Sequence, residues 1–215
     1  MIEIFILSLI QGVTEFLPVS SSSHLILVSK YLEFSNQNLS TDVSLHIGSF
    51  FAVIFYFRKD LFNFFKNKEL FSKIIFASIP VMIVGFILVK FNFIDQLRNL
   101  KIIGWTTIVF GFLLYVSDKF KNKKKIKNLK YNSAFFIGLF QVLSLVPGVS
   151  RSGITITGSR FLNFCRFDSV KISFLISIPT LAMISLYNLQ ILITEKNFLI
   201  SKINFIGIVL SFLFS

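Results

Sequence analysis

The sequence contains very few of the residues on which several common architectures and chemistries depend. Cys165 is the only cysteine among 215 residues, which excludes an intrachain disulfide framework and a cysteine-based metal site. Histidine occurs only at positions 24 and 46, and 10 acidic residues stand against 22 lysines and arginines. Prolines number only four, so Pro18 and Pro147, which interrupt otherwise apolar stretches, mark breaks in the chain.

Apolar residues are abundant instead. Hydrophobic residues make up 54% of the chain, 29 residues are phenylalanine and the mean hydropathy is +0.76. Soluble domains are about 45–50% apolar, so the composition predicts an integral membrane protein. The net charge of +12 is then better explained by basic cytoplasmic loops near anionic headgroups than by nucleic-acid binding. No cleavable signal peptide is expected, because residues 1–10 lack a basic n-region.

Five apolar segments have the length expected of membrane-spanning helices. One begins near Ile203 and is still running at Ser215, and the others lie at roughly 41–57, 72–90, 102–117 and 170–193. Residues 1–28 and 132–157 differ, because a proline accompanied by serine or glycine breaks each of them at its middle. Each is predicted to be a re-entrant helix hairpin, since broken backbone at membrane depth is tolerated where it lines a protein cavity.

The distribution of basic residues favours re-entry of the second broken segment. Lysine and arginine dominate residues 58–73, read as a loop, and residues 118–130, which places both on the cytoplasmic side. If residues 132–157 turn back, the basic segment 158–171 is cytoplasmic as well and the loop 194–202 is outside. A full crossing would put the more basic of those two loops outside. Charge does not settle the same question for the first hairpin.

The predicted organisation is one all-α polytopic membrane domain over residues 1–215, built from an inverted repeat of a re-entrant hairpin plus three transmembrane helices. The first repeat covers about 1–118, with its hairpin at 1–28. The second covers about 132–215, with its hairpin at 132–157, and is truncated at the C-terminus. Three spans is an odd number, so the second copy is inverted. Such repeats commonly place a site near the midplane, and the two hairpin tips are expected to converge there.

The two hairpins also share a polar sequence pattern. Residues 11–24 read Gln-Gly-Val-Thr-Glu-Phe-Leu-Pro-Val-Ser-Ser-Ser-Ser-His, and residues 141–155 read Gln-Val-Leu-Ser-Leu-Val-Pro-Gly-Val-Ser-Arg-Ser-Gly-Ile-Thr. Ionisable groups are costly in a bilayer, so Glu15, His24 and Arg151 indicate function. A carboxylate, hydroxyl, imidazole and guanidinium suit phosphoryl transfer, because arginine binds phosphate bidentately and the others can hold a metal or move a proton.

Other polar residues receive structural interpretations. His46 lies in the first span and is interpreted as a helix-packing group rather than a catalyst. Gly148 and Gly153 are assigned to the turn and to close packing. The seven lysines between residues 119 and 130 are interpreted as determinants of topology.

Together the two motifs resemble the signatures of the undecaprenyl-diphosphate phosphatase family, also called bacitracin-resistance proteins. The first is the Glu/Gln-x-x-x-Glu box running into Phe-Leu-Pro-Val-Ser-Ser and a histidine. The second is Pro-Gly-x-Ser-Arg-Ser-x-x-Thr, here Pro147 to Thr155. The resemblance covers essentially the whole chain. It implies an intramembrane hydrolase that removes one phosphate from undecaprenyl diphosphate on the outer side of the bacterial cytoplasmic (inner) membrane, which recycles the lipid carrier for cell-wall polymers.

The resemblance also implies residue roles. Four residues match catalytic positions, namely the essential carboxylate Glu15, the serine Ser21, the histidine His24 and the phosphate-binding Arg151. Gln11 occupies the first box position, where some members have glutamate, so only Glu15 can act there as a base or an anionic metal ligand. The expected cofactor is a divalent metal, Mg²⁺ or Ca²⁺, held by Glu15. The expected substrate-binding residues are Gln11, Ser20, Ser150, Ser152 and Thr155.

Two other function classes remain as alternatives. An inverted repeat is also a transporter architecture, so a lipid flippase or transporter is the main one. An intramembrane serine–histidine hydrolase acting on a peptide or ester is the other, although Arg151 favours phosphate over an acyl group. The expected partners are a polyprenyl diphosphate substrate and membrane lipids but no nucleic acid, with a homodimer left open.

Overall fold

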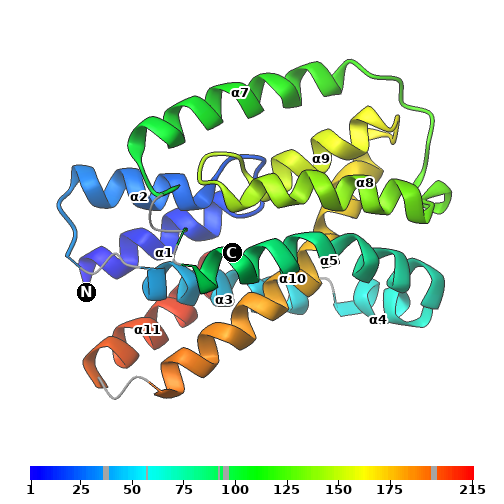
Figure 1. Cartoon of the computed structure of the whole chain (residues 1–215). Helices are drawn as coiled ribbons and strands as arrows, with labels where there is room; N and C mark the ends of the chain where they lie inside the picture. The colour runs from blue at the N-terminus through cyan, green and yellow to red at the C-terminus, as the bar shows by residue number, and fades with distance from the viewer. Residues whose placement is uncertain (36–38, 57, 92, 94–96, 195–197) are drawn as a thin grey trace. The chain divides into compact units, whose positions relative to one another are not determined.

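The computed structural model describes the chain except for residues 36–38, 57, 92, 94–96 and 195–197. Glu195 and Lys196 of the loop predicted to lie outside are therefore not among the described residues. Figure 1 shows the helices, whose bounds are α1 Ile2–Thr14, α2 Ser21–Tyr31, α3 Leu39–Tyr56, α4 Arg58–Lys66, α5 Lys68–Lys90, α7 Leu100–Asp118, α8 Tyr131–Val142, α9 Arg151–Phe161, α10 Arg166–Thr194 and α11 Phe198–Phe214. Two short 3-10 helices are η1 Ile126–Asn128 and η2 Leu143–Leu145.

Helices account for every regular element among the described residues, which confirms the predicted all-α class. Within those residues, three helices are long and apolar enough to cross a membrane, namely α5, α7 and the Arg166–Leu186 part of α10. Shorter apolar helices occur at Ile2–Thr14, Tyr131–Leu145 and Lys202–Phe214. These features are consistent with a membrane protein. The five segments predicted as spans each fall on a helix, in order α3, α5, α7, α10 and α11, and three of these helices have the length and apolar character of a span.

The segment 58–73, which the sequence suggested was a loop, is mostly helical. It contains α4 and the first turn of α5. Leu61 and Phe64 are buried and three residues apart, so they share one face of α4, and packing of this face explains the helix. Asn67 then caps α5, because its side chain accepts a hydrogen bond from the backbone N–H of Leu70 at 3.1 Å.

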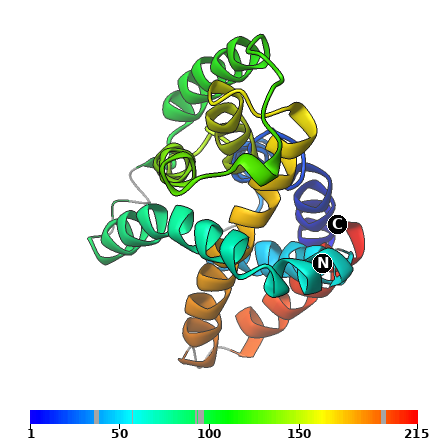
Figure 2. The ribbon, with the colours of Figure 1, turned by 90° about the vertical axis from the view of Figure 1, so that its right-hand side faces the viewer.

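The chain forms two compact units, which are described separately. The first contains Met1–Leu17, Ser21–Leu61 and Leu181–Ser215, and the second contains Pro18–Ser20 and Phe62–Thr180. In the first unit α1 packs on α2, α3 and α11, and α3 packs on α11. In the second unit α5 packs on α8, and α7 runs beside α9 in both views (Figures 1 and 2).

Close backbone contact positions the helices of the first unit. A β-carbon added at Gly12 of α1 would lie 2.6 Å from the carbonyl carbon of Phe214, and one added at Gly48 of α3 would overlap the backbone of Ile208. Small residues allow this approach in helix packing. The apolar core beside these contacts consists of Ile4, Leu7, Leu25 and Leu45. As a result, the C-terminal ends of α1 and α11 lie near the middle of α3.

In the second unit, a buried arginine ties the end of α7 to the end of α9. Arg160 is 1% exposed and donates to the backbone carbonyls of Asp118 at 2.8 Å, Phe120 at 2.6 Å and Phe164 at 2.5 Å. These include carbonyls at the C-terminus of α7, which a helix cannot satisfy internally. The exposed Arg166 adds a bidentate pair with the Asp118 carboxylate at 2.8 and 2.6 Å.

Candidate functional site

Glu15 lies at the centre of a buried polar cluster in the first unit. It directly follows α1, and its side chain is only 3% exposed. The Oε2 atom of Glu15 accepts hydrogen bonds from Gln11 Nε2 at 2.9 Å and from the Ser21 hydroxyl at 2.8 Å. Gln11 lies one helical turn earlier, and Ser21 begins α2 after the break at Pro18. The first motif therefore brings its amide, carboxylate and serine together.

His46 also reaches this carboxylate, although its sequence context suggested only packing. Its Nε2 atom lies 3.3 Å from Glu15 Oε2, while its Nδ1 atom donates to the carbonyl of Asp42 at 2.7 Å. The bond to Asp42, one turn earlier in α3, turns the other ring nitrogen toward Glu15. An ionisable residue inside an apolar span was the only sequence signal for this role.

Three serines extend the cluster across α3 and α11. Ser49 lies 3.4 Å from Gln11 Nε2 and 3.0 Å from the Ser211 hydroxyl, and it accepts a hydrogen bond from Ser215 at 2.9 Å. No motif in the sequence marks Ser49, Ser211 or Ser215 as site residues. His46 and Ser49 are three residues apart on one helix face, but nothing in the sequence reveals that this face meets α1.

Glu15 and Gln11 carry oxygen atoms of the kind that bind divalent metals. Gln11 is fully buried, and its Oε1 atom has no hydrogen-bond partner. An unpaired amide oxygen beside a carboxylate is the kind of ligand that Mg²⁺ and Ca²⁺ prefer. The described residues contain no group of three or more histidine, cysteine, aspartate or glutamate side chains that could hold a metal. Such an ion would therefore need further oxygen ligands, which a diphosphate can supply.

The second motif forms a strained turn into α9. Gly148 has a φ of 99°, and Ser150, which is not glycine, has a φ of 62°. Ser150 caps α9 by accepting from Gly153 N at 3.2 Å, and its hydroxyl lies 3.2 Å from that of Ser152. Arg151, the first residue of α9, is half-buried. A helix N-terminus and an arginine at one position suit a phosphate group.

The remaining predicted site residues have different surroundings. Thr155 is 1% exposed, donates to the Arg151 carbonyl at 2.8 Å and lies 2.7 Å from Ser173 of α10. Ser20, at the tip of the first motif, accepts from the backbone N–H of Gly148 at 3.3 Å, so this tip contacts the second motif. His24 lies one turn after Ser21 in α2 and is exposed.

The structure thus groups the predicted residues into two sets. Gln11, Glu15 and Ser21 meet in the first unit, which also contains the exposed His24. The second unit contains Ser20, Ser150, Arg151, Ser152 and Thr155. The predicted convergence of the Glu15 and Arg151 groups concerns both units and stays a prediction.

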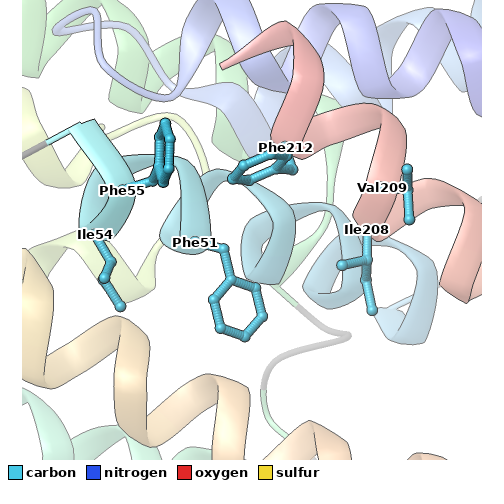
Figure 3. Close-up of a pocket in the computed structure, with 6 residues that line it drawn as sticks. All are labelled: Phe51, Ile54, Phe55, Ile208, Val209 and Phe212. Carbon is cyan, nitrogen blue, oxygen red and sulfur yellow. The ribbon is translucent and has the colours of Figure 1, made fainter.

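An apolar groove of about 460 Å³ lies on the α3–α11 pair (Figure 3). Its lining residues are Phe51, Ile54 and Phe55 from α3 and Ile208, Val209 and Phe212 from α11. Ser49 precedes Phe51 by two positions, and Ser211 directly precedes Phe212. The groove and the polar cluster around Glu15 therefore involve the same two helices, although residues two apart on a helix, such as Ser49 and Phe51, do not share a face.

Comparison with known proteins gives consistent matches. Residues 4–215 match the family model described as bacitracin resistance protein BacA. The chain is 50% identical over 216 residues to an undecaprenyl-diphosphatase of Pelagibacter ubique (strain HTCC1062), which covers 100% of this chain and 84% of that protein. It is 42% identical to the undecaprenyl-diphosphatase of Saccharophagus degradans, over 89% of this chain and 77% of that one. The protein of the same name from Campylobacter curvus is 41% identical, with 85% and 74% covered.

Proposed function

Because the chain belongs to the bacitracin resistance protein BacA family, we propose that it hydrolyses undecaprenyl diphosphate to undecaprenyl phosphate and inorganic phosphate. The observation that carries the proposal is the buried carboxylate of Glu15, hydrogen-bonded to the Ser21 hydroxyl at 2.8 Å. A serine becomes an effective nucleophile when a base accepts its proton. The contact between Ser21 and Glu15 joins a nucleophile to a base in this way, and the guanidinium of Arg151 is suited to binding phosphate.

In the proposed reaction, Ser21 Oγ attacks the terminal phosphorus of the diphosphate. The bond from that phosphorus to the bridging oxygen breaks, and undecaprenyl phosphate leaves with the bridging oxygen. Glu15 takes the serine proton because it already accepts that hydrogen bond. His24 is exposed and is assigned to the second step, in which it activates the water that hydrolyses the phosphoserine. Arg151 binds the transferred phosphoryl group.

A divalent metal fits the same site. Glu15 and Gln11 Oε1 would hold Mg²⁺ or Ca²⁺ together with substrate oxygens. When bound, the metal supplies charge neutralisation for the diphosphate. Gln11 and the hydroxyls of Ser20, Ser150 and Ser152 complete the proposed site as groups that bind the substrate. The buried Thr155 contributes indirectly, because its hydroxyl bonds the carbonyl of Arg151 at the start of α9.

The rival route is direct attack by water, with Ser21 only donating a hydrogen bond. Rapid-quench labelling with substrate carrying ³²P in its terminal phosphate, followed by peptide mapping, separates the two routes. Covalent catalysis requires label on Ser21 during turnover and near-complete loss of activity in Ser21→Ala. Turnover without any label on Ser21 would reject the nucleophile while leaving the phosphatase activity in place.

We also propose that the whole chain is one membrane domain with an inverted repeat. Helices α2 and α9 both have 11 residues and begin at Ser21 and Arg151, 130 positions apart. Their C-terminal caps repeat as well, because Phe34 N donates to Ser29 O at 2.8 Å and Phe164 N to Ser159 O at 3.2 Å. The same cap hydrogen bond thus recurs 130 positions later in the chain, which supports α2 and α9 as two copies of one structural repeat.

The re-entrant hairpins belong to the same proposal. Helices α8 and α9 have 12 and 11 residues, whereas a spanning helix needs about 20. The chain before α8 contacts the chain after α9, because Lys124 N donates to Asn163 O and Cys165 N to Lys124 O, both at 2.9 Å. These contacts support a second hairpin that begins and ends on one side. We place the protein in the inner (cytoplasmic) membrane of a bacterium, with the site facing the outer side.

The groove on α3 and α11 provides a place for the prenyl chain of the substrate. Its apolar lining comes from the two helices that also carry the Ser49–Ser211 contact, and we propose that a substrate with its diphosphate at Glu15 extends its prenyl chain toward it. Ile54→Trp should lower kcat/KM for undecaprenyl diphosphate but leave that for the short farnesyl diphosphate unchanged. Ile83→Trp, on the exposed face of α5, is the matched control. Equal effects on both substrates would reject the groove as the chain site.

The experiment that tests the function is release of inorganic phosphate from undecaprenyl diphosphate by the purified protein in detergent. Wild-type protein should release phosphate when Mg²⁺ or Ca²⁺ is supplied, and Glu15→Gln should not. Reconstituted vesicles with substrate in the outer leaflet separate hydrolysis from lipid movement. Transfer of intact undecaprenyl diphosphate between leaflets without phosphate release would support a flippase and contradict the proposal.

A further inference from the structure

Helix α7 contacts the strained turn of the second motif through two adjacent threonines. The hydroxyl of Thr106 donates to the carbonyl of Pro147 at 2.7 Å, and that of Thr107 lies 3.4 Å from the carbonyl of Gly148. The approach is close, because a β-carbon at Gly148 would overlap Thr106 Oγ1 and lie 2.8 Å from the carbonyl of Ile103. Two consecutive peptide groups of the turn are thus turned toward α7.

This turn needs support from its surroundings. A positive φ is uncommon outside glycine, and backbone in such a conformation is strained and persists only where other contacts hold it. Ser150 is such a residue, with a φ of 62°, and it directly precedes Arg151. Besides the threonines, Ser20 holds the turn by accepting from Gly148 N at 3.3 Å.

The contacts at the two ends of α7 matter because the helix is otherwise little buried. Within α7 only Ile103 and Ser117 are buried. The N-terminal half of α7 contacts the turn through Thr106 and Thr107, and its C-terminal residue Asp118 accepts from Arg160 of α9 through its carbonyl at 2.8 Å. Helix α7 therefore braces α9 at both of its ends.

We propose that Thr106 is a positioning residue, which fixes the Pro147 carbonyl and thereby sets where α9 begins and how Arg151 is presented. The inference rests on the proposed function, in which Arg151 binds the transferred phosphoryl group. The Thr106 hydroxyl has one proton, and the carbonyls of Ile102 and Ile103 at 2.8 and 3.1 Å compete for it. Pro147 offers the shortest of the three contacts, at 2.7 Å.

The test compares variants that keep or remove this hydroxyl. Thr106→Val preserves the shape of the side chain and loses the donor, whereas Thr106→Ser keeps the donor. Misplacement of a binding group by about 1 Å can cost on the order of a hundredfold in rate. We expect Thr106→Val to lower kcat/KM by roughly ten- to a hundredfold and to weaken product inhibition by inorganic phosphate. Thr106→Ser should restore both, and Ile108→Val, an exposed change in the same helix, should alter neither.

A readout independent of turnover separates this inference from the proposed function. Hydrogen exchange of the amides of residues 148–151, followed by mass spectrometry, should be faster in Thr106→Val than in wild type and Thr106→Ser. If wild-type protein releases no phosphate, faster exchange still supports the brace while the function fails. Equal exchange and equal phosphate inhibition in wild type and Thr106→Val would overturn the inference. Equal impairment of the valine and serine variants would also overturn it, because packing rather than the hydrogen bond would then be responsible.

Discussion

At the scale of single residues, the proposed chemistry depends on the shape and charge of a few side chains. Arg151 stands at the first position of α9, after a turn in which Gly148 and Ser150 both have positive φ. Its planar guanidinium can make two parallel hydrogen bonds to one phosphate. Strained backbone of this kind persists only where the surrounding structure fixes it, and it is common at functional sites. The strain before Arg151 is therefore consistent with a functional role for this side chain.

Arg151→Lys should therefore be close to inactive although the charge is retained. Lysine is a compact point charge and cannot reproduce the planar fork on a phosphate. Phosphate release by purified Arg151→Lys in detergent checks this expectation, with Arg166→Lys, at an exposed position, as the control that should remain active. Near-normal activity of Arg151→Lys would remove its assigned role.

Glu15→Gln should abolish metal-stimulated activity, while Gln11→Ala should be milder. Glu15 supplies the carboxylate on which Gln11, Ser21 and His46 converge, and divalent cations favour carboxylate oxygens. Gln11 contributes a neutral oxygen and a hydrogen bond of 2.9 Å to that carboxylate. Titration of activity with Mg²⁺ for both variants measures the difference. A fully active Glu15→Gln with unchanged Mg²⁺ dependence would reject both the metal and the proton-acceptor roles.

At the scale of elements, the ends of helices carry much of the specific structure. The C-terminus of α7 and the end of α9 share Arg160, whose guanidinium is bonded to the carbonyls of Asp118, Phe120 and Phe164 and to the side chain of Asn122. A buried charge without hydrogen-bond partners is costly, so the buried guanidinium needs these acceptors. The carbonyls in turn need its donors, because burial removes them from water. The same junction carries the exposed pair between Arg166 and Asp118.

Arg160→Lys should destabilise the protein strongly, and Arg166→Lys should not. An ammonium has three donors and cannot reach all the acceptors that the guanidinium fork reaches, so buried carbonyls lose their partners. Breaking a buried charged network typically costs about 3–5 kcal/mol, whereas exposed pairs contribute little. Thermal unfolding of both variants in one detergent, followed by circular dichroism, compares them directly. Similar melting temperatures would mean that Arg160 is not a structural tie.

At the scale of the whole molecule, the proposed second hairpin would set the topology. The segment before α8 and the segment after α9 are joined by backbone hydrogen bonds between Lys124, Asn163 and Cys165. Both segments are rich in basic residues, which favours the cytoplasmic side for both. Re-entry satisfies the contacts and the charge distribution together, whereas a full crossing would separate the two segments.

Cysteine labelling tests this topology. With Cys165 replaced by serine, Phe167→Cys and Lys125→Cys would each carry a single exposed thiol. Both should resist an impermeant thiol reagent in intact cells and react in inverted membrane vesicles. Labelling of Phe167→Cys but not of Lys125→Cys in intact cells would contradict the hairpin, because a full crossing at 132–157 puts the two positions on opposite sides.

The sequence by itself determined the class of the protein, its helical segments and the residues of both motifs. Composition and apolar segment length are local properties, so the all-α class and the positions of the main helices could be predicted. The cost of ionisable groups in a membrane singled out Glu15, His24 and Arg151 as candidates, and their roles stay predictions. The expectation of a loop at residues 58–73 was wrong for a local reason as well. The many charged residues of this segment outweighed the short apolar face formed by Leu61 and Phe64.

Only the tertiary structure decided which other residues join the site. His46 meets Glu15 at 3.3 Å, and Ser49 meets Ser211 at 3.0 Å, across separations of 31 and 162 positions. Thr106 likewise reaches Pro147 only because α7 packs against the second motif. Such contacts depend on which helix faces pack together, and a largely apolar sequence offers many faces that could do so. The chemistry of each side chain is fixed by its own residue, but its partners are fixed by packing.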